Sequence, residues 1–223
     1  MSPSFADARV ATTQPLALHL VEEISHRVVN DYAEAIAILS LAAARGPGAA
    51  GPALTQAADR LRAQAEAHRA LMRPFFDGPM DLGLYVGRLC ASLSEASLGE
   101  RGIHLTLQAD EIWLDAVQCW RVGLIVSELI RNAVRHGLSG RAGAIGVSLT
   151  ERGDRVRCIV SDDGSAISNP PEGRGRRLVR TLVAELEGVV DWWFTASGSF
   201  AGLEFPVAPE TGCDSLGLFK RRA

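Results

Sequence analysis

Apolar side chains recur at steps of three and four over two long stretches near the start of the chain, residues 16–45 and 53–73. Between them the run GPGAAGP, at 46–52, interrupts the helical pattern with prolines and glycines. The pattern predicts an antiparallel helical hairpin after a flexible tail at 1–15. Because such a hairpin buries only one stripe per helix, we expect a second copy to cover it, giving a four-helix bundle in a homodimer.

A turn-rich boundary at residues 73–81 is followed by a mixed pattern of helices and strands. The expected order is a helix (DLGLYVGRLCASLSEA), two strands (IHLTLQA, DEIWLD), a helix (116–136), a β-hairpin (AIGVSLTERGDRVRCIVSDDG), a helix (174–187) and two strands (VVDWWFTAS, FAGLEFPV). Helices combined with a mostly antiparallel sheet predict a two-layer α/β sandwich, and an α+β fold overall. The predicted domains are the hairpin at 16–76 and the sandwich at 77–208, with a polar tail at 209–223.

Composition narrows the function classes. The 223 residues carry a formal net charge of −3, which gives no reason to expect nucleic acid or an anionic membrane as a partner. The four cysteines are scattered without zinc-ligand spacing. No apolar run approaches the roughly 20 residues of a membrane span, and the first residues lack the features of a signal peptide. We therefore expect a cytoplasmic protein with no sensory domain before its first helix.

The stretch EEISHRVVND contains the first candidate site. If Ile24 is the centre of the buried stripe, His26 lies roughly 200° around the helix and faces solvent, with Glu22 and Asn30 one turn on either side. A neutral imidazole is a good nucleophile, a carboxylate can accept its proton, and an amide can orient a phosphoryl group. The pattern fits a phosphoryl-accepting histidine or an ordinary solvated helix face. His19, one heptad earlier, is the competing candidate.

The stretch LIVSELIRNAVRHG, residues 124–137, contains the second candidate site. Glu128 and Asn132 are four residues apart and share one face of the expected helix. A carboxylate and an amide oxygen at this spacing suit Mg²⁺, which carries nucleotide phosphates with it. The alternative is an amphipathic helix with a solvated polar side. His136, at the end of the same helix, can cap it or line a pocket.

Two glycine-containing segments follow in the chain. The strand ending VSDDG places Asp162 where it can accept a hydrogen bond from an adenine amino group, while Gly164 permits close backbone approach. In GRGRRLV, Gly173 and Gly175 precede a helix whose N-terminus can present N–H groups to phosphates. Each motif alone is weak, and the specificity lies in their order and spacing after an acceptor hairpin.

These segments together resemble a sensor histidine kinase core, over about residues 16–207. EEISHRVVND is similar to the acceptor motif of the branch with His-Arg-Val and a following Asn, SELIRNAVRHG to the N-box, and SDDG and GRGRRLVRTLVAELEG to the two glycine boxes. The resemblance implies a dimerising hairpin and a Bergerat-type ATP-binding sandwich shared with GHKL ATPases. It makes His26 the phosphoacceptor and Asn30 the auxiliary amide. It assigns Mg²⁺-ATP to Glu128, Asn132, His136, Asp162, Gly164, Gly173, Gly175 and Arg176, with Glu128 and Asn132 nearest the metal.

The sequence departs from the family pattern in three places. Arg27 follows the acceptor histidine where many kinases carry an acid, so the general base is left open between Glu22 and Glu23. The first glycine box ends in Ala166 instead of glycine, and only six residues separate it from Gly173, which predicts a very short ATP lid. Arginines stand where apolar residues are common: Arg174, Arg176 and Arg177. They can replace lid cations on the phosphates, or mark a pocket drifting away from nucleotide.

Three functions are consistent with these residues. In the first, a histidine kinase without its own sensor autophosphorylates His26 from Mg²⁺-ATP, passes the phosphoryl group to an aspartate of a response-regulator receiver domain, and takes its input from a separate sensor protein. In the second, a phosphotransferase adaptor with a degenerate ATP domain relays phosphoryl groups between receivers. In the third, a non-catalytic dimeric module uses the fold for partner binding alone.

Overall fold

The computed structural model describes residues 16–45, 50–73, 78–165 and 173–207, and for residues 16–26 it describes the backbone alone. The predicted tails therefore lie outside the described residues, as do most of the interhelix break and the predicted ATP lid. Among the described residues, no helix is long and apolar enough to cross a membrane.

Two helices form the predicted hairpin, α1 (Leu16–Arg45) and α2 (Ala50–Ala70). The first begins where the sequence pattern placed it. The second begins three residues earlier than expected, because its first turn takes in Pro52, and proline is tolerated there since the first turn has no intrahelical partner for its N–H. The predicted break between the helices is correspondingly shorter than 46–52.

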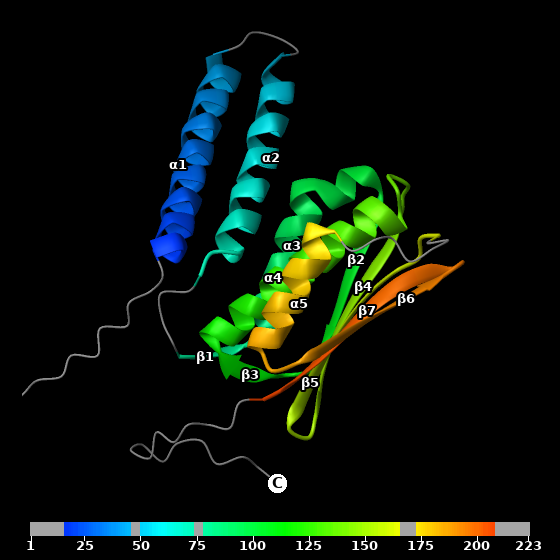
Figure 1. Ribbon diagram of the computed structural model, residues 1–223. Coiled ribbons are helices and arrows are strands. Elements are labelled where there is room, and N and C mark those ends of the chain that lie inside the picture. The colour runs from blue at the N-terminus through cyan, green and yellow to red at the C-terminus, as the bar shows by residue number, and fades with distance from the viewer. Residues whose placement is uncertain (1–15, 46–49, 74–77, 166–172, 208–223) are drawn as a thin grey trace, which may run out of the picture.

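The second part of the chain is a two-layer α/β sandwich (Figure 1). Its helical elements are α3 (Leu82–Leu93), which continues as η1 (Ser94–Leu98) and η2 (Gly99–Arg101), α4 (Ala116–Asn132), which continues as η3 (Ala133–Gly137), and α5 (Arg174–Glu185). Its strands are β1 (Pro79–Asp81), β2 (Ile103–Ala109), β3 (Trp113–Asp115), β4 (Gly143–Arg152), β5 (Arg155–Asp162), β6 (Val189–Thr195) and β7 (Gly198–Pro206). The predicted α+β class is confirmed.

The main sheet has the strand order β2-β4-β5-β7-β6. Its β2–β4 pair is parallel and its other pairs are antiparallel, in agreement with the mostly antiparallel sheet expected from sequence. The strand β1 was not predicted: it lies in the segment interpreted as a turn-rich boundary, and it pairs with β3 to form a separate two-stranded sheet.

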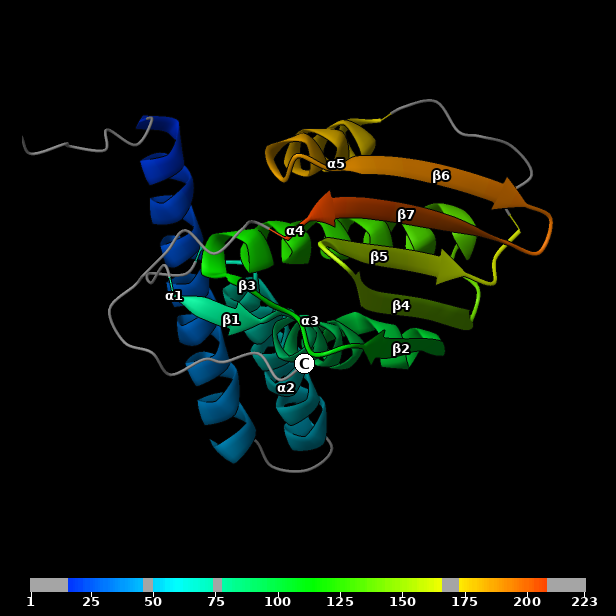
Figure 2. The same cartoon turned by 90° about the horizontal axis from the view of Figure 1, so that it is seen from below.

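The core lies between the sheet and the helices α3, α4 and α5, which cover one of its faces (Figures 1 and 2). Alternate residues of β4, β5 and β7 are buried beneath the helices, as a sheet with one covered face requires. The largest fully buried side chains include Phe205, Leu82, Leu89, Ile125 and Leu149. This packing fixes α4, which carries most of the second candidate site, against the sheet.

The hairpin joins the sandwich through α2, which packs beside α3 and η1, and Arg60 in its middle pairs with Glu100 of η2 at 2.6 Å. The hydroxyl of Tyr85 donates to the carbonyl of Ala70 at 2.6 Å, and the indole N–H of Trp120 donates to the carbonyl of Leu71 at 2.8 Å. These are carbonyls at the C-terminus of a helix, where no intrahelical donor exists. Side chains of α3 and α4 therefore supply the donors that α2 lacks at its end.

Candidate functional site

The predicted phosphoacceptor segment lies within the helix α1. Asn30 is exposed, as expected, and Val28 is half-buried. The side chains of Glu22, Glu23 and His26 lie outside the described residues, so the proposed orientation of the histidine stays a prediction.

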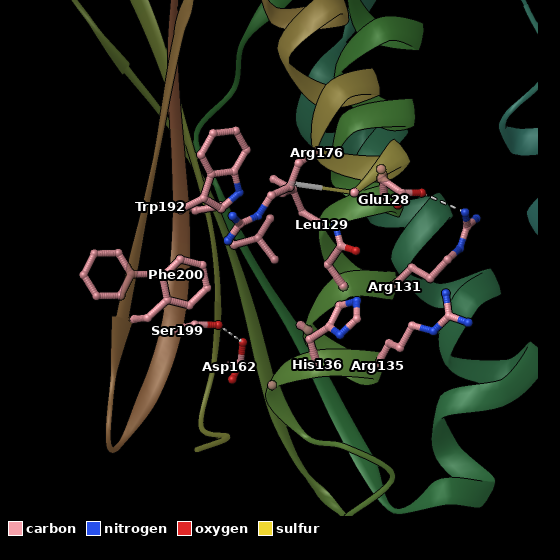
Figure 3. A pocket seen from close by; sticks show the side chains of 18 of the residues that line it. Glu128, Leu129, Arg131, Arg135, His136, Asp162, Arg176, Trp192, Ser199 and Phe200 are labelled. Carbon is pink, nitrogen blue, oxygen red and sulfur yellow. Dashed lines mark hydrogen bonds and ion pairs between the residues drawn. The ribbon is translucent and has the colours of Figure 1, made fainter. Parts of the chain in front are cut away.

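A cavity of about 890 Å³ lies between α4 with η3 on one side, the start of α5, and the strands β5, β6 and β7 (Figure 3). The chain segments that sequence analysis had linked to nucleotide meet there. The lining includes Glu128, Asn132, His136, Asp162, Gly173, Gly175 and Arg176. Gly164 is not part of the lining but packs directly beside Asp162. Among the side chains that the structure describes, none from the hairpin lines the cavity.

Asp162 lies at the sheet side of this cavity, and it is 9% exposed. One carboxylate oxygen accepts the backbone N–H of Gly164 at 2.9 Å, and the other accepts the hydroxyl of Ser199 at 2.5 Å. A Cβ atom on Gly137 would come within 2.4 Å of the carboxylate, and one on Gly164 within 2.1 Å of the Gly137 carbonyl. The glycines thus let the backbone pack closely around the Asp162 carboxylate. Each of its oxygens accepts one hydrogen bond and can accept a second one from a donor group of a ligand.

Ser199 was missed by sequence analysis, because its role depends on strand pairing. It lies opposite Asp162 in the β5–β7 register, a relation between residues 37 positions apart that no local motif reveals. The hydroxyl fixes which side of the carboxylate faces the cavity. Ser199 is therefore a positioning residue for Asp162.

Glu128 is buried at the other side of the cavity, with 9% of its surface exposed. Its carboxylate pairs with Arg131 at 2.8 Å, one turn along α4, and lies against the first turn of α5. A Cβ atom on Gly175 would come within 2.0 Å of a Glu128 oxygen. The absence of a side chain at Gly175 is what allows α4 and α5 to approach so closely. Asn132 is half-buried one turn further along α4 and also lines the cavity.

The oxygen donors of α4 suit Mg²⁺ only in combination with a nucleotide. No group of three His, Cys, Asp or Glu side chains with the geometry of a metal site occurs among the described residues. Glu128 and Asn132 offer a carboxylate and an amide oxygen on one helix face, and Mg²⁺ commonly takes one or two protein oxygens and completes its shell with phosphates and water. The donor set therefore fits a metal that arrives with its nucleotide.

An aromatic and basic wall is the second feature that sequence analysis missed. Trp192 and Phe194, on the helix side of β6, line the cavity, and the guanidinium of Arg176 stands over both rings. The sequence predicted a strand at VVDWWFTAS, but not which of its aromatic residues face the helices or that an arginine of α5 lies on them. Further cations at the cavity are Arg131, Arg135 and Arg174.

Comparisons with known proteins agree with this architecture. The family described as "Histidine kinase" matches residues 23–97, and the family described as "Histidine kinase-like ATPase domain" matches residues 101–189. Blue-light-activated histidine kinase 2 of Erythrobacter litoralis is 28% identical over 204 residues, covering 84% of this chain and 57% of its own length. The sensor histidine kinase PdtaS of Mycobacterium tuberculosis is 29% identical over 177 residues, covering 75% and 35%. The chain thus spans between a third and three fifths of these relatives.

Solved structures share the fold. The histidine kinase domain of the Erythrobacter litoralis EL346 blue-light-activated histidine kinase superposes with a TM-score of 0.56 at 25% identity, covering 78% of this chain and 96% of that one. A bacterial phosphotransferase has a TM-score of 0.58 at 14% identity, covering 86% and 98%, which shows a common fold. With both family matches falling on the hairpin and the sandwich in the expected order, the chain belongs to the histidine kinases, as a sensor histidine kinase core with a GHKL-type ATPase domain.

Proposed function

We propose that the protein is an ATP-dependent protein-histidine kinase that autophosphorylates His26 and passes the phosphoryl group to an aspartate of a response-regulator receiver domain. The observation that carries this proposal is the cavity itself. Three segments far apart in sequence, 128–136, 162–164 and 173–176, meet around one space, and each brings the residue types that a nucleotide requires. A pocket that binds no nucleotide gives no evident reason for these polar residues and glycines to lie together.

The residues suggest how ATP would lie. Asp162, held by Ser199 and Gly164, would accept the adenine amino group at the sheet side of the cavity. The phosphates would extend toward the first turn of α5, where Gly173 and Gly175 expose backbone N–H groups. Glu128 and Asn132 would hold Mg²⁺ there. The metal, when bound, would neutralise charge on the transferring phosphoryl group.

In the transfer step, an imidazole nitrogen of His26 attacks the γ-phosphorus, the bond to the β-phosphate oxygen breaks, and ADP leaves with that electron pair. The attacking ring carries the new P–N bond, and its surplus proton passes to a carboxylate or to water. Glu22 and Glu23, both on α1, are the candidate acceptors. Asn30 is exposed one turn after the histidine and would orient the phosphoryl group.

The partners follow from the same chemistry. A receiver domain must approach His26 on the exposed side of the hairpin, and a second copy of the chain would complete a four-helix bundle. These parts of the proposal rest on the family and on the hairpin. The relatives extend well beyond the length matched here, so their partners are not carried over to this chain from the match alone.

A phosphotransferase adaptor is the second candidate. The likeness to the bacterial phosphotransferase covers nearly all of that chain, and it concerns the fold alone at 14% identity. In this alternative His26 would exchange phosphoryl groups between receivers, and the cavity would not bind ATP. Binding of a nucleotide to the cavity separates the two candidates.

The decisive experiment is incubation of the purified chain with Mg²⁺ and γ-labelled ATP. Wild type is compared with His26→Ala and Asn132→Ala, and with His19→Ala as the matched control on the same helix. We expect an acid-labile, alkali-stable label on wild type and His19→Ala, and none on the other two variants.

An unlabelled but folded wild type would overturn the kinase proposal. Label transferred to wild type from a phosphorylated receiver domain, without ATP, would then identify the adaptor. Label retained by His26→Ala and lost by His19→Ala would move the acceptor one heptad toward the N-terminus.

A further inference from the structure

Trp192 and Phe194 form a platform for one particular arginine. The Cζ atom of Arg176 lies 5.3 Å from the centroid of the Trp192 ring and 4.8 Å from that of Phe194. Figure 3 shows the Arg176 side chain reaching from α5 toward Trp192 on the facing strand. Distances of this size are those of cation–π contacts, which are strongest where water is partly excluded. Arg176 is half-buried, so the contact is not a fully solvated one.

The platform restricts the rotamers of the Arg176 side chain. An arginine side chain loses rotamer entropy when a ligand fixes it. Arg176 is held over two rings before any ligand arrives, so little of that ordering remains to be done on binding. Two aromatic residues at alternate positions of β6 thus pre-organise a cation in the wall of the cavity.

The charge of the cavity indicates which ligand group this cation meets. Among the described residues, the lining contains four arginines and two carboxylates. One carboxylate, Glu128, is paired with Arg131, and the other, Asp162, accepts two hydrogen bonds at the sheet side. The surplus of positive charge therefore favours an anionic part of the ligand. Guanidinium groups match phosphate oxygens in both charge and fork geometry.

We propose that Trp192 and Phe194 are positioning residues that hold Arg176 as a ligand of the phosphate chain of a nucleoside polyphosphate. The inference rests on the proposed function and deepens it. It makes Trp192 and Phe194, both on the strand β6, part of phosphate recognition. It also assigns to Arg176 the neutralisation of phosphate charge that cations of a longer ATP lid would supply.

Arg180 is an internal control for the role of Arg176. Arg180, one turn after Arg176 on α5, also stands over Trp192, with its Cζ atom 4.8 Å from the ring centroid. Arg180 does not line the cavity. Both arginines lie on α5 over the Trp192 ring and carry the same charge, but only Arg176 also lies over Phe194 and lines the cavity.

The test is calorimetric titration of the full chain with ATP, ADP and adenosine. Arg176→Gln should weaken ATP and ADP binding by about tenfold or more, the effect of losing a charge-assisted hydrogen bond, and leave adenosine binding unchanged. Arg180→Gln should bind all three as wild type does. Trp192→Leu should reproduce part of the Arg176→Gln loss, and Trp192→Phe should restore binding. The Arg176→Gln/Trp192→Leu double variant should be no weaker than Arg176→Gln, because the tryptophan acts through the arginine.

The possible failures are distinguishable. If wild type binds ATP and Arg176→Gln binds it equally well, the inference is overturned and the proposed function stands. If Trp192→Leu weakens adenosine as much as ATP, the platform contacts the base, and the phosphate assignment is wrong. If folded wild type binds none of the three ligands, the inference and the proposed function fall together. Should Trp192→Leu not fold, the comparison of Arg176→Gln with Arg180→Gln still decides.

Discussion

Gly173 and Gly175 are two residues apart in one motif, yet they stand in different surroundings. A Cβ atom on Gly173 would meet nothing within 4 Å, whereas one on Gly175 would strike the Glu128 carboxylate. Neither glycine has a backbone conformation reserved for glycine. The requirement at Gly175 is therefore one of space between α4 and α5, and at Gly173 any such requirement must come from the ligand.

This difference predicts unequal effects of alanine. Gly175→Ala should lower the free energy of unfolding by about 1–3 kcal/mol, as overpacking does, because Glu128 or the start of α5 must move. Gly173→Ala should leave stability unchanged. Urea denaturation of both variants beside wild type measures this. Equal stability of the two variants would contradict the close packing of α5 on Glu128.

Three buried thiols give the protein a predictable response to alkali. Burial raises the pKa of Cys90 to about 11, and of Cys119 and Cys158 to about 12, from an ordinary value of 9.0; nearby carboxylates add to the effect at Cys119. Above pH 9 the unfolded chain loses thiol protons that the folded chain keeps. Stability that is fully present below pH 9 should therefore fall toward pH 12, by about 1.4 kcal/mol per pH unit for each thiol.

The measurement is urea denaturation at pH 8 and pH 10. Cys158→Ala is the control, because removing one thiol should make the decline with pH shallower than in wild type. Identical pH dependence in the two proteins would show that this thiol ionises as readily in the folded chain as in the unfolded one.

The sequence allowed the main residues of the cavity to be predicted, because each belongs to a local motif. Glu128 and Asn132 share a helix face through their spacing, and Asp162 ends an apolar strand. The contacts of Ser199 and Arg176 could not be predicted in this way. One depends on the register between β5 and β7, and the other on which strand α5 faces, and both are set by tertiary packing.

At the scale of elements, the end of α2 is one of the points where the two parts of the chain meet, together with the Arg60–Glu100 ion pair further up the helix. Tyr85 and Trp120 satisfy its last carbonyls, and α4, which carries Trp120, carries Glu128 two turns later. Gly123 makes room for this arrangement, since a Cβ atom there would come within 2.6 Å of the Tyr85 ring. Burial raises the pKa of the Tyr85 hydroxyl above its ordinary value of 10.0, so the group remains a donor in alkaline solution where an exposed tyrosine would ionise.

Removing these donors should loosen the junction. Tyr85→Phe and Trp120→Phe each leave a carbonyl without its partner, so each should lower the free energy of unfolding by about 1–3 kcal/mol. Trp113→Phe is the matched control, because the indole N–H of Trp113 donates to an exposed carboxylate of Glu111 at 3.0 Å. Chemical denaturation of the three variants measures the difference. A loss in Trp113→Phe equal to that in Trp120→Phe would contradict it.

Element boundaries were predicted best where the hydrophobic periodicity and the flanking turn or helix-breaking residues agree. The helix α1 and the strand β2 began at their predicted residues. The strand β1 escaped prediction because three residues are too few for a period-two pattern, and its existence depends on pairing with β3. The start of α2 was placed too late because proline was interpreted as a break, although the first helical turn accepts it.

At the scale of the molecule, the hairpin presents apolar residues that the described chain does not cover. Ile38 and Leu41, on α1, are 60% and 50% exposed. In the proposed dimer they would pack against the hairpin of a second copy.

Replacing both residues should therefore produce monomers. Ile38→Glu/Leu41→Glu should halve the mass measured by light scattering after size exclusion, because two carboxylates cannot be buried in a bundle core without partners. Leu84→Glu, at an equally exposed site on α3, should leave the mass unchanged. A wild-type chain that elutes as a monomer would refute dimerisation through the hairpin.

The positions of the four tryptophans have a consequence for observing the protein at work. Trp120 lies at the junction with α2, Trp192 lies in the cavity wall, and Trp113 and Trp193 are exposed on the surface. Replacing the two exposed residues by phenylalanine would leave two intrinsic fluorophores, Trp120 on α4 at the junction and Trp192 on β6 in the cavity wall. Stopped-flow emission from variants retaining only Trp192 or only Trp120 would then time ligand arrival and hairpin movement separately, without any attached dye.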